Sequence, residues 1–338
     1  MCANCTRLER ECFYDQGEKA NKPTPNLLSL AREDSFDLMS LKLMHNYTEA
    51  TCAQISDNPD HLKAWQHHVP EIAFQQRFLL HGLLAVSALH LHHEKQSEGN
   101  SELLRVAHDH QAQALAEFIP LLSCVTDENC HALFAFSFVV ATMSYALVGR
   151  VRSTNNSSLA ATFLDELVAI FDLLKGATMV AVSAKDTLRR GPLVALMDDR
   201  HPLLDRDVDY DDLQLPDDLK RLLDHIEAVE SVRAPERLNC YKLSIQKLSV
   251  LSSSAMEGVS PLGAVLGWPA LVQIDFLTML RSRDPPAMAV LAFYGAVLHR
   301  LDDVWFLRGI GTSIVSSVLA SIEEGWLPYL DNLKSLAT

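Results

Sequence analysis

The sequence predicts an all-α protein, and three observations support this prediction. Apolar residues recur at three- and four-residue steps through most of the chain, which is the period of an α-helix. Strict alternation of apolar and polar residues, which is typical of strands, nowhere continues beyond a few residues. The chain has 338 residues, of which 48% are hydrophobic and 21% charged, so it is long and apolar enough to bury a large core.

The net charge of −14 disfavours a broad nucleic-acid-binding surface on the residues present. The first twenty residues are polar and charged and lack the apolar region of a secretory signal. The seven cysteines are odd in number and unevenly spread, which is more typical of a reducing compartment than of a disulfide framework. We therefore expect an intracellular protein.

The first segment carries three cysteines, Cys2, Cys5 and Cys12, in the spacing C-x2-C-x6-C. Thiolates at such spacing suit zinc, which takes four ligands in a tetrahedron, but three are too few for a closed site. The spacing alone leaves two interpretations open, part of a metal site or three free cysteines on a frayed terminus. Residues 16–34 are polar and contain two prolines, so we expect a flexible linker there.

Helices follow in order. The first is expected over residues 35–56, with a break at Asp57-Asn-Pro59. A short helix over 60–69 precedes Pro70, which can occupy the first position of the next helix. That next helix, Phe74 to His93, is apolar nearly all round, so it should be enclosed by protein as the central helix of the domain.

The pattern over residues 101–118 predicts a long helix that begins at Ser101. The stretch 132–149 contains no charged residue and has the minimum length of a membrane span. Hydroxyl-bearing residues such as Ser137 and Thr142 dilute it. We therefore expect a second buried core helix there and no membrane association.

The remaining helices are separated by glycine, proline and aspartate-rich stretches. One is expected over 159–175, ended by Gly176 as a C-terminal cap, and another up to about Arg190, stopped by Gly191-Pro192. Residues 198–218 should form an exposed loop, and the uncharged run 261–269 is interrupted by prolines and glycines. Further helices are expected at 217–231, 235–256, 270–283, 285–301 and 311–324.

No pattern predicts an enzyme. His90 and Glu94 share a helical face and could bind zinc or iron, but the sequence supplies no third ligand for them. The aspartates from Asp205 to Asp211 resemble the start of a calcium loop, yet the required glycine and final glutamate are missing. Acidic pairs lack the pattern of a terpene synthase, and neither a nucleophile elbow nor a phosphate-binding glycine loop is present.

The N-terminal stretch CANCTRLERECFY resembles the second half of the fungal Zn2Cys6 binuclear cluster. In that family the first half carries the basic helix that enters the DNA major groove, and no residue here matches it. The resemblance implies that Cys2, Cys5 and Cys12 are half of a zinc site. Zinc and DNA should then bind only through a complete cluster.

Later stretches resemble the C-terminal regulatory domain of fungal zinc-cluster factors of the sterol uptake control type. They are LKLMHNYT (41–48), VPEIAFQQRFLLHGLLAVSALHLHH (69–93), IFDLLKGATMVAV with RRGPLVALMD (170–198), SPLGAVLGWP (260–269), AMAVLAFYGAVLHRLDDVWFLRGIG (287–311) and EEGWLPYL (323–330). The resemblance implies three parts: a partial cluster over 1–15, a linker over 16–34, and one large all-α effector domain over 35–332. It also implies a nuclear, usually dimeric protein.

The resemblance further implies a transcription regulator of sterol or secondary-metabolite genes, controlled by a hydrophobic ligand that is sterol-like or polyketide-like. Apolar character marks seven candidates for the ligand pocket, although core packing would use the same side chains. They are Phe134, Phe138, Tyr145, Phe293, Tyr294, Trp305 and Phe306. Two alternatives stay open: a descendant without DNA binding that binds a ligand or partner in nucleus or cytoplasm, or a natural-product enzyme built on this scaffold.

Overall fold

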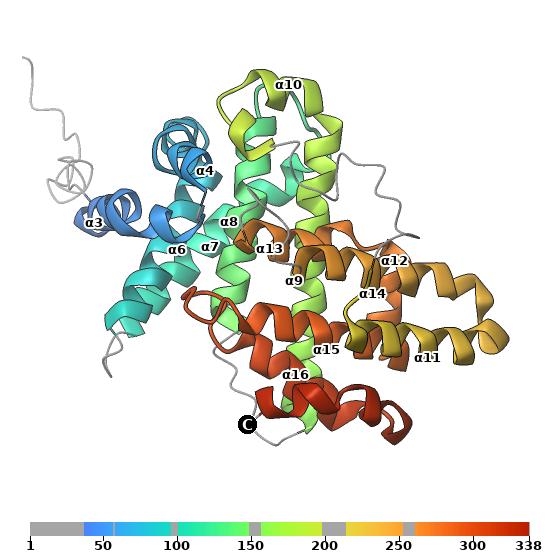
Figure 1. Ribbon diagram of the computed structural model, residues 1–338. Helices are drawn as coiled ribbons and strands as arrows, with labels where there is room; N and C mark the ends of the chain where they lie inside the picture. Colours follow the sequence, from blue (N-terminus) through green and yellow to red (C-terminus); the bar gives the residue numbers. More distant parts are fainter. Residues whose placement is uncertain are drawn as a thin grey trace, which may run out of the picture. The chain divides into compact units, whose positions relative to one another are not determined.

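Helices form all the regular structure in the described part of the chain, which confirms the predicted all-α class. The structure is a computed structural model that describes residues 37–56, 58–95, 101–148, 157–197, 214–252 and 261–337 (Figure 1). The chain divides into two units, Met1–Met39 and Ser40–Thr338. Nearly all described residues belong to the second unit, and the packing below is that of this unit.

The first half of the chain contains several short helices followed by the long helices α6, α7 and α8. They are α3 (Leu38–Asn46), the π-helical turn η1 (Tyr47–Thr51), the 3-10 turn η2 (Cys52–Gln54), α4 (Pro59–Lys63), the π-helical turn η3 (Ala64–His68), α5 (Val69–Ala73), α6 (Arg77–Lys95), α7 (Ser101–Leu121) and α8 (Cys130–Val148).

The second half continues with longer helices and ends in short 3-10 turns. These elements are α9 (Ser157–Ser183), α10 (Lys185–Arg190), η4 (Val194–Met197), α11 (Asp217–Arg233), α12 (Pro235–Ser252), α13 (Pro261–Leu271), α14 (Ile274–Arg281), α15 (Pro285–His299), α16 (Ile310–Ser321), η6 (Glu324–Tyr329) and η7 (Asp331–Leu336).

Helices α6, α7 and α8 pack through aromatic rings. The centroid of the Phe78 ring lies 5.9 Å from that of Phe118 on α7 and 5.4 Å from that of Phe136 on α8. Gly82 lies one turn further along α6, where an added Cβ would stand 2.6 Å from a ring carbon of Phe136. The small residues of α6 therefore allow close approach of α8.

Helix α8 is the one helix of the described residues that is long and apolar enough to cross a membrane. Of its most apolar 18-residue window, 72% is buried inside the protein. It packs against α6 on one side and α9 on another. Because its apolar side chains contact other helices, α8 is a core helix of this fold.

Trp268 joins the helices of the second half. Its ring stacks on Tyr294 of α15 at 4.6 Å between centroids and lies edge-on to Phe171 of α9 at 6.2 Å. Its indole Nε1–H donates a hydrogen bond of 3.0 Å to the carbonyl of Ser244 on α12. Trp268 is fully buried, so one side chain of α13 holds three neighbouring helices.

Two lysines close the C-terminal end of α13. Lys175 of α9 donates to the carbonyls of Ala270, at 3.2 Å, and of Val272. Lys247 of α12 donates to the carbonyl of Leu271 at 2.8 Å. The last carbonyls of a helix have no partner within it, and the negative end of the helix dipole favours cations there.

The central helix begins later than the sequence predicted. Helix α6 starts at Arg77, whereas Pro70 lies in the separate short helix α5. The chain turns between the two helices, where Gln75 and Gln76 donate to carbonyls of α5. Phe74 ends α5 with 66% of its surface exposed. An apolar residue that the pattern assigned to the core therefore lies at the surface.

Two further predictions were wrong because tertiary packing outweighs local helix signals. Helix α9 continues through Gly176, which was expected to end it, and buries Leu174 and Val180 on either side. Helix α13 spans the run 261–269 that was expected to be interrupted. Its Pro269 occupies an interior position next to Trp268, whose anchoring contacts offset the lost backbone hydrogen bond.

Candidate functional site

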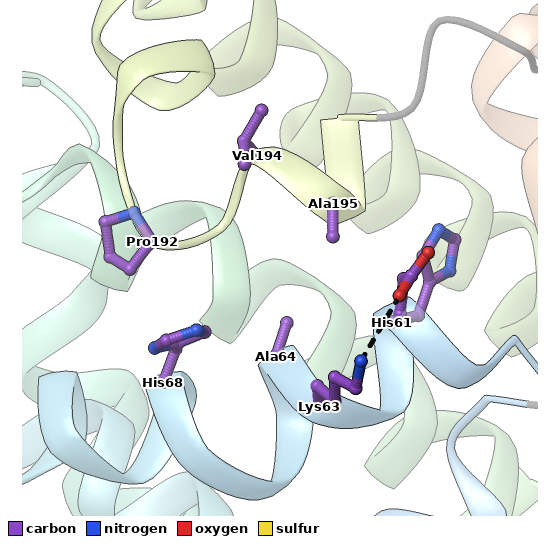
Figure 2. Close-up of a pocket in the computed structure, with 8 residues that line it drawn as sticks. His61, Lys63, Ala64, His68, Pro192, Val194 and Ala195 are labelled. Atoms are coloured by element: carbon purple, nitrogen blue, oxygen red, sulfur yellow. Dashed lines mark ion pairs between the residues drawn. The ribbon is translucent and has the colours of Figure 1, made fainter.

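A groove between two distant segments is the candidate binding site of the described residues (Figure 2). Its volume is about 330 Å³, at the lower end of the range of about 300–1,000 Å³ typical of small-molecule sites. The lining residues are Asp60, His61, Lys63, Ala64, His68, Pro192, Val194 and Ala195. We call this set the histidine groove.

One wall of the histidine groove comes from α4 and η3. Asn58 begins this wall by accepting hydrogen bonds from the backbone N–H groups of Asp60, at 2.9 Å, and His61, at 3.2 Å. The helix then widens into the π-helical turn η3, which contains Ala64 and His68. π-helical turns are rare and are often found at functional sites.

The opposite wall is the segment that follows α10. Figure 2 shows Ala64 and His68 on the helix below, and Pro192 and Ala195 on the segment above them. Gly191 fixes the position of this segment, because an added Cβ would stand 1.8 Å from Nε2 of His131 on α8. No side chain other than hydrogen can occupy position 191 without moving His131. The wall is therefore set by close packing against the core.

The groove combines polar groups at its rim with an apolar wall. Lys63 and Asp60 form an ion pair of 3.7 Å in which both side chains are well exposed, so the pair is weak and exchangeable. His61 and His68 add imidazole groups. The lining therefore carries no excess negative charge, whereas the whole chain has a net charge of −14.

Hydrogen bonds between the two π-helical turns support the first wall from behind. The hydroxyl of Tyr47 in η1 donates to the carbonyl of Trp65 in η3 at 3.1 Å. Gln66 in η3 donates to the carbonyl of Thr48 in η1 at 3.3 Å. Tyr47 is fully buried, and its burial raises the pKa of its phenol, so the phenol stays a protonated donor at neutral pH.

A buried polar network connects η1 to the middle of α6. Asn46 donates to the hydroxyls of Thr51 and Ser87, both at 3.0 Å, and Ser87 donates to the carbonyl of Leu43 at 2.7 Å. Nδ1 of His90 lies 3.0 Å from the Thr51 hydroxyl. Burial lowers the pKa of His90, which favours the neutral ring. The network is satisfied internally and fixes how α3, η1 and α6 fit together.

The histidine and carboxylate pair expected on α6 is present but does not gather further ligands. Nε2 of His90 lies 3.8 Å from Oε1 of Glu94. The other His90 nitrogen is engaged with Thr51, as described above. Among the described residues, no group of three or more histidine, cysteine or acidic side chains could hold a metal ion. Cys2, Cys5 and Cys12 and the aspartate loop lie outside the described residues.

The seven predicted pocket residues separate into different parts of the core. Phe134 and Phe138 meet edge to face at 5.1 Å, and Trp65 contacts Phe138. Trp305 and Phe306 form another pair, with a centroid distance of 5.6 Å. None of the seven lines the histidine groove.

Tyr145 and Tyr294 are brought together, as a ligand-orienting pair would require. Both are fully buried, and their phenols lie close enough for each to influence the pKa of the other. Burial raises the pKa of each phenol. The polar tips that we expected to orient a ligand thus lie together in the core between α8 and α15.

A second hollow of about 360 Å³ lies between α12 and α14. It is lined by Glu236, Arg237, Asn239, Cys240, Gln273, Asp275, Thr278, Met279 and Ser282. Burial, together with Asp275, raises the pKa of the Cys240 thiol to about 11, so this cysteine is a protonated thiol and no nucleophile at neutral pH. The Arg237 guanidinium forms an ion pair of 3.5 Å with Asp284, so the basic group of this hollow already has a partner.

Sequence reasoning missed the histidine groove. Residues 60–69 were expected only to form a short helix, and the stretch RRGPLVALMD stood out only as part of a family resemblance. The available signals were the glycine at position 191 and the apolar residues after it. Neither signal indicates that residues 192–195 face η3, because that pairing depends on the tertiary fold.

Comparison with known proteins identifies relatives over most of the chain. Residues 42–148 match the fungal specific transcription factor domain. A Zn(2)-C6 fungal-type transcription factor of Gibberella zeae is 24% identical over 308 residues, covering 87% of this chain and 61% of the relative. Sterol uptake control protein 2 of Saccharomyces cerevisiae is 26% identical over 297 residues, covering 84% of this chain and 30% of the relative. The protein of the same name in Candida albicans is 24% identical over 315 residues, covering 85% and 41%. This chain therefore spans less than two thirds of each of these relatives.

Proposed function

We propose that the chain belongs to the fungal Zn2Cys6-type transcription factors that carry the fungal specific transcription factor domain, and that it is the regulatory part of a transcription regulator. The observation that carries this proposal is the extent of the match. The family domain covers residues 42–148, from α3 to the end of α8, and the relatives align over 84–87% of the chain. The relatives are named as transcription factors and sterol control proteins, not as enzymes.

The proposed regulator acts in the nucleus on sterol or secondary-metabolite genes and responds to a hydrophobic ligand. Zinc and DNA are bound through a complete Zn2Cys6 cluster, of which Cys2, Cys5 and Cys12 supply half. The regulatory domain forms a homodimer. The names of the relatives support the sterol connection, and the acidic, helical second unit is suited to contacts with proteins or small molecules rather than DNA.

A fusion experiment tests this function. Residues 35–338 would be attached to a heterologous DNA-binding domain in a fungal reporter strain, and reporter output would be compared with that of the DNA-binding domain alone. A regulatory domain should change the output at least about threefold and should respond to sterol depletion. The matched control is Leu83→Asp, since Leu83 is fully buried and an unpaired charge there should unfold the domain.

The second candidate function is a descendant without DNA binding that acts by binding a ligand or a partner. It shares the family scaffold with the regulator, and it is favoured by the histidine groove, which offers a candidate binding site. A fusion that leaves reporter output unchanged, although the protein is folded and present in the nucleus, would favour this candidate and count against the regulator.

A further inference from the structure

We propose that the histidine groove binds a small organic acid with an apolar tail, with its carboxylate at the Lys63 end and its hydrocarbon part against the segment 192–195. Binding by the purified chain does not depend on gene regulation. A role of the acid as an effector does rest on the proposed function. The site lies outside the aromatic core in which a hydrophobic ligand was expected.

The rim of the groove supplies donors suited to a carboxylate. Lys63 carries an ammonium group beside His61, and His68 offers a further ring nitrogen at the other end of the same wall (Figure 2). The one carboxylate in the lining, Asp60, is already paired with Lys63 in an exposed contact of 3.7 Å. A ligand carboxylate can replace or share this contact, because exposed ion pairs of this kind contribute little to stability.

The surroundings of the groove favour an acid over an amine. The lining has one lysine against one aspartate, and the wall segment follows directly after Arg189 and Arg190 at the end of α10. In a chain with a net charge of −14, this is a local region without excess negative charge. An ammonium ligand would meet a single carboxylate, Asp60, whereas an anion would meet the ammonium of Lys63 and the imidazole N–H groups of the lining.

The far wall suits a hydrocarbon. Pro192, Val194 and Ala195 present carbon surface without a polar side chain, and half of the surface of Val194 is exposed. Ala64 completes the apolar part on the opposite side (Figure 2). A neutral alcohol with the same tail would gain this apolar contact but would lose the charge-assisted hydrogen bonds at the rim.

Both walls of the groove are preformed, which lowers the entropic cost of ordering the site when a ligand binds. Gly191 packs against His131 without room for a Cβ, and Asn58 caps the opposite wall. Binding therefore requires no rearrangement of the backbone in either wall.

The test uses the whole purified chain and three probes of equal length: octanoate, 1-octanol and octylamine. Binding is followed by isothermal titration calorimetry and by the melting temperature. We expect octanoate to bind and raise the melting temperature, with a Kd at least about tenfold lower than those of octanol and octylamine. Equal binding of the three probes, preferential binding of octylamine, or no binding of octanoate would overturn the proposal.

Variants locate the site. The double variant Lys63→Gln with His68→Gln should weaken octanoate binding about tenfold, and Ala195→Asp should abolish it by placing a carboxylate in the groove. Lys220→Gln on α11 is the matched control, because Lys220 is an exposed lysine that does not line the groove. Lys63 and His68 are both exposed, so the double variant should fold even if Ala195→Asp does not. Unchanged octanoate binding in the double variant would contradict the site.

The fusion reporter separates this inference from the proposed function. If octanoate binds to the purified chain but the fusion is inactive, the binding site is supported and the proposed regulatory function is contradicted. If the fusion is active but the purified chain does not bind octanoate, the regulatory function is supported and the binding site is contradicted.

Discussion

At the scale of single residues, replacing either of two helical glycines by alanine should change the stability of the fold in opposite directions. Gly82 on α6 faces the ring of Phe136, and a Cβ added at Gly82 would stand 2.6 Å from a carbon of that ring. Gly176 on α9 has no atom within 4 Å of the corresponding position. We expect Gly82→Ala to destabilise the fold by about 1–3 kcal/mol through overpacking. Gly176→Ala should stabilise it by about 0.5–1 kcal/mol, because alanine restricts the unfolded chain and favours the helix.

Urea unfolding of the two variants under identical conditions measures both effects. Each glycine serves as the control for the other, since the chemical change is the same and only the surroundings differ. Destabilisation of similar size at both positions would show that the close contact between α6 and α8 is not what requires glycine at position 82.

A buried glutamate predicts a dependence of stability on pH. Glu230 is only 2% exposed, and burial, followed by the nearby Asp284, raises the pKa of its carboxyl group above the usual 4.5. The folded state therefore holds the proton more tightly than the unfolded chain does. The stability that this group contributes is fully present below about pH 4.5 and is lost as the pH rises through the pKa of the folded state.

Glu230→Gln removes the ionisation, so this variant should be more stable than the wild type at pH 7 to 8 and similar to it near pH 4. Urea unfolding midpoints across this range measure the difference. Glu227→Gln is the matched control, because Glu227 lies on the same helix and is exposed. A stability difference that does not vary with pH would contradict the assignment to Glu230.

At the scale of elements, the end of α13 depends on the amines of Lys175 and Lys247. Burial lowers the pKa of both amines, and their hydrogen bonds serve three consecutive carbonyls. Replacing both lysines by methionine keeps the apolar stems and leaves these carbonyls without their partners. We expect a loss of about 1–2 kcal/mol in stability and faster hydrogen exchange of the amides of Trp268, Ala270, Leu271 and Val272.

Lys220→Met on α11 controls for the loss of a lysine, since Lys220 is exposed. Exchange at 268–272 that stays as slow in the double variant as in the wild type would show that Trp268 alone holds α13. In that case the lysine contacts would be dispensable.

The same helices show how far the sequence could predict the elements. The apolar period located α6, α8, α11, α12 and α15 within a few residues, because each buries a continuous face. It failed at Gly176 and at Pro269, where local signals indicated helix ends. Leu174 and Val180 bury the α9 turn around Gly176, and Trp268 buries the α13 turn that contains Pro269. Trp268 is held by Phe171, Ser244 and Tyr294, which lie on three other helices, so no local pattern could reveal these contacts.

The candidate site was less predictable than the fold for a related reason. The histidine groove pairs residues 60–68 with residues 192–195, which only the tertiary fold brings together. The aromatic residues that apolar character selected are largely core residues, and Tyr145 and Tyr294 are fully buried. Composition cannot distinguish a ring that packs on a neighbour from a ring that contacts a ligand.

At the scale of the whole molecule, the net charge of −14 bears on DNA binding. Specific binding depends on basic groups that neutralise phosphates and on a helix that reads bases. These 338 residues carry one C-x2-C-x6-C segment and no basic partner segment matching the first half of the cluster. We expect the chain alone to show no specific binding to CGG-containing duplexes at about 0.15 M salt, whereas specific complexes typically have Kd values of about 10⁻⁸–10⁻¹¹ M.

The companion protein in this experiment carries the basic first half of the cluster from an intact relative, joined directly before Cys2 and supplied with zinc. If Cys2, Cys5 and Cys12 form a working second half, gel shifts should now show specific binding that disappears with a chelator. Cys5→Ser should abolish that binding, because two zinc ions cannot be held by five thiolates in the required geometry. Nanomolar binding by the chain without the added segment would contradict the prediction, and so would specific binding that survives Cys5→Ser.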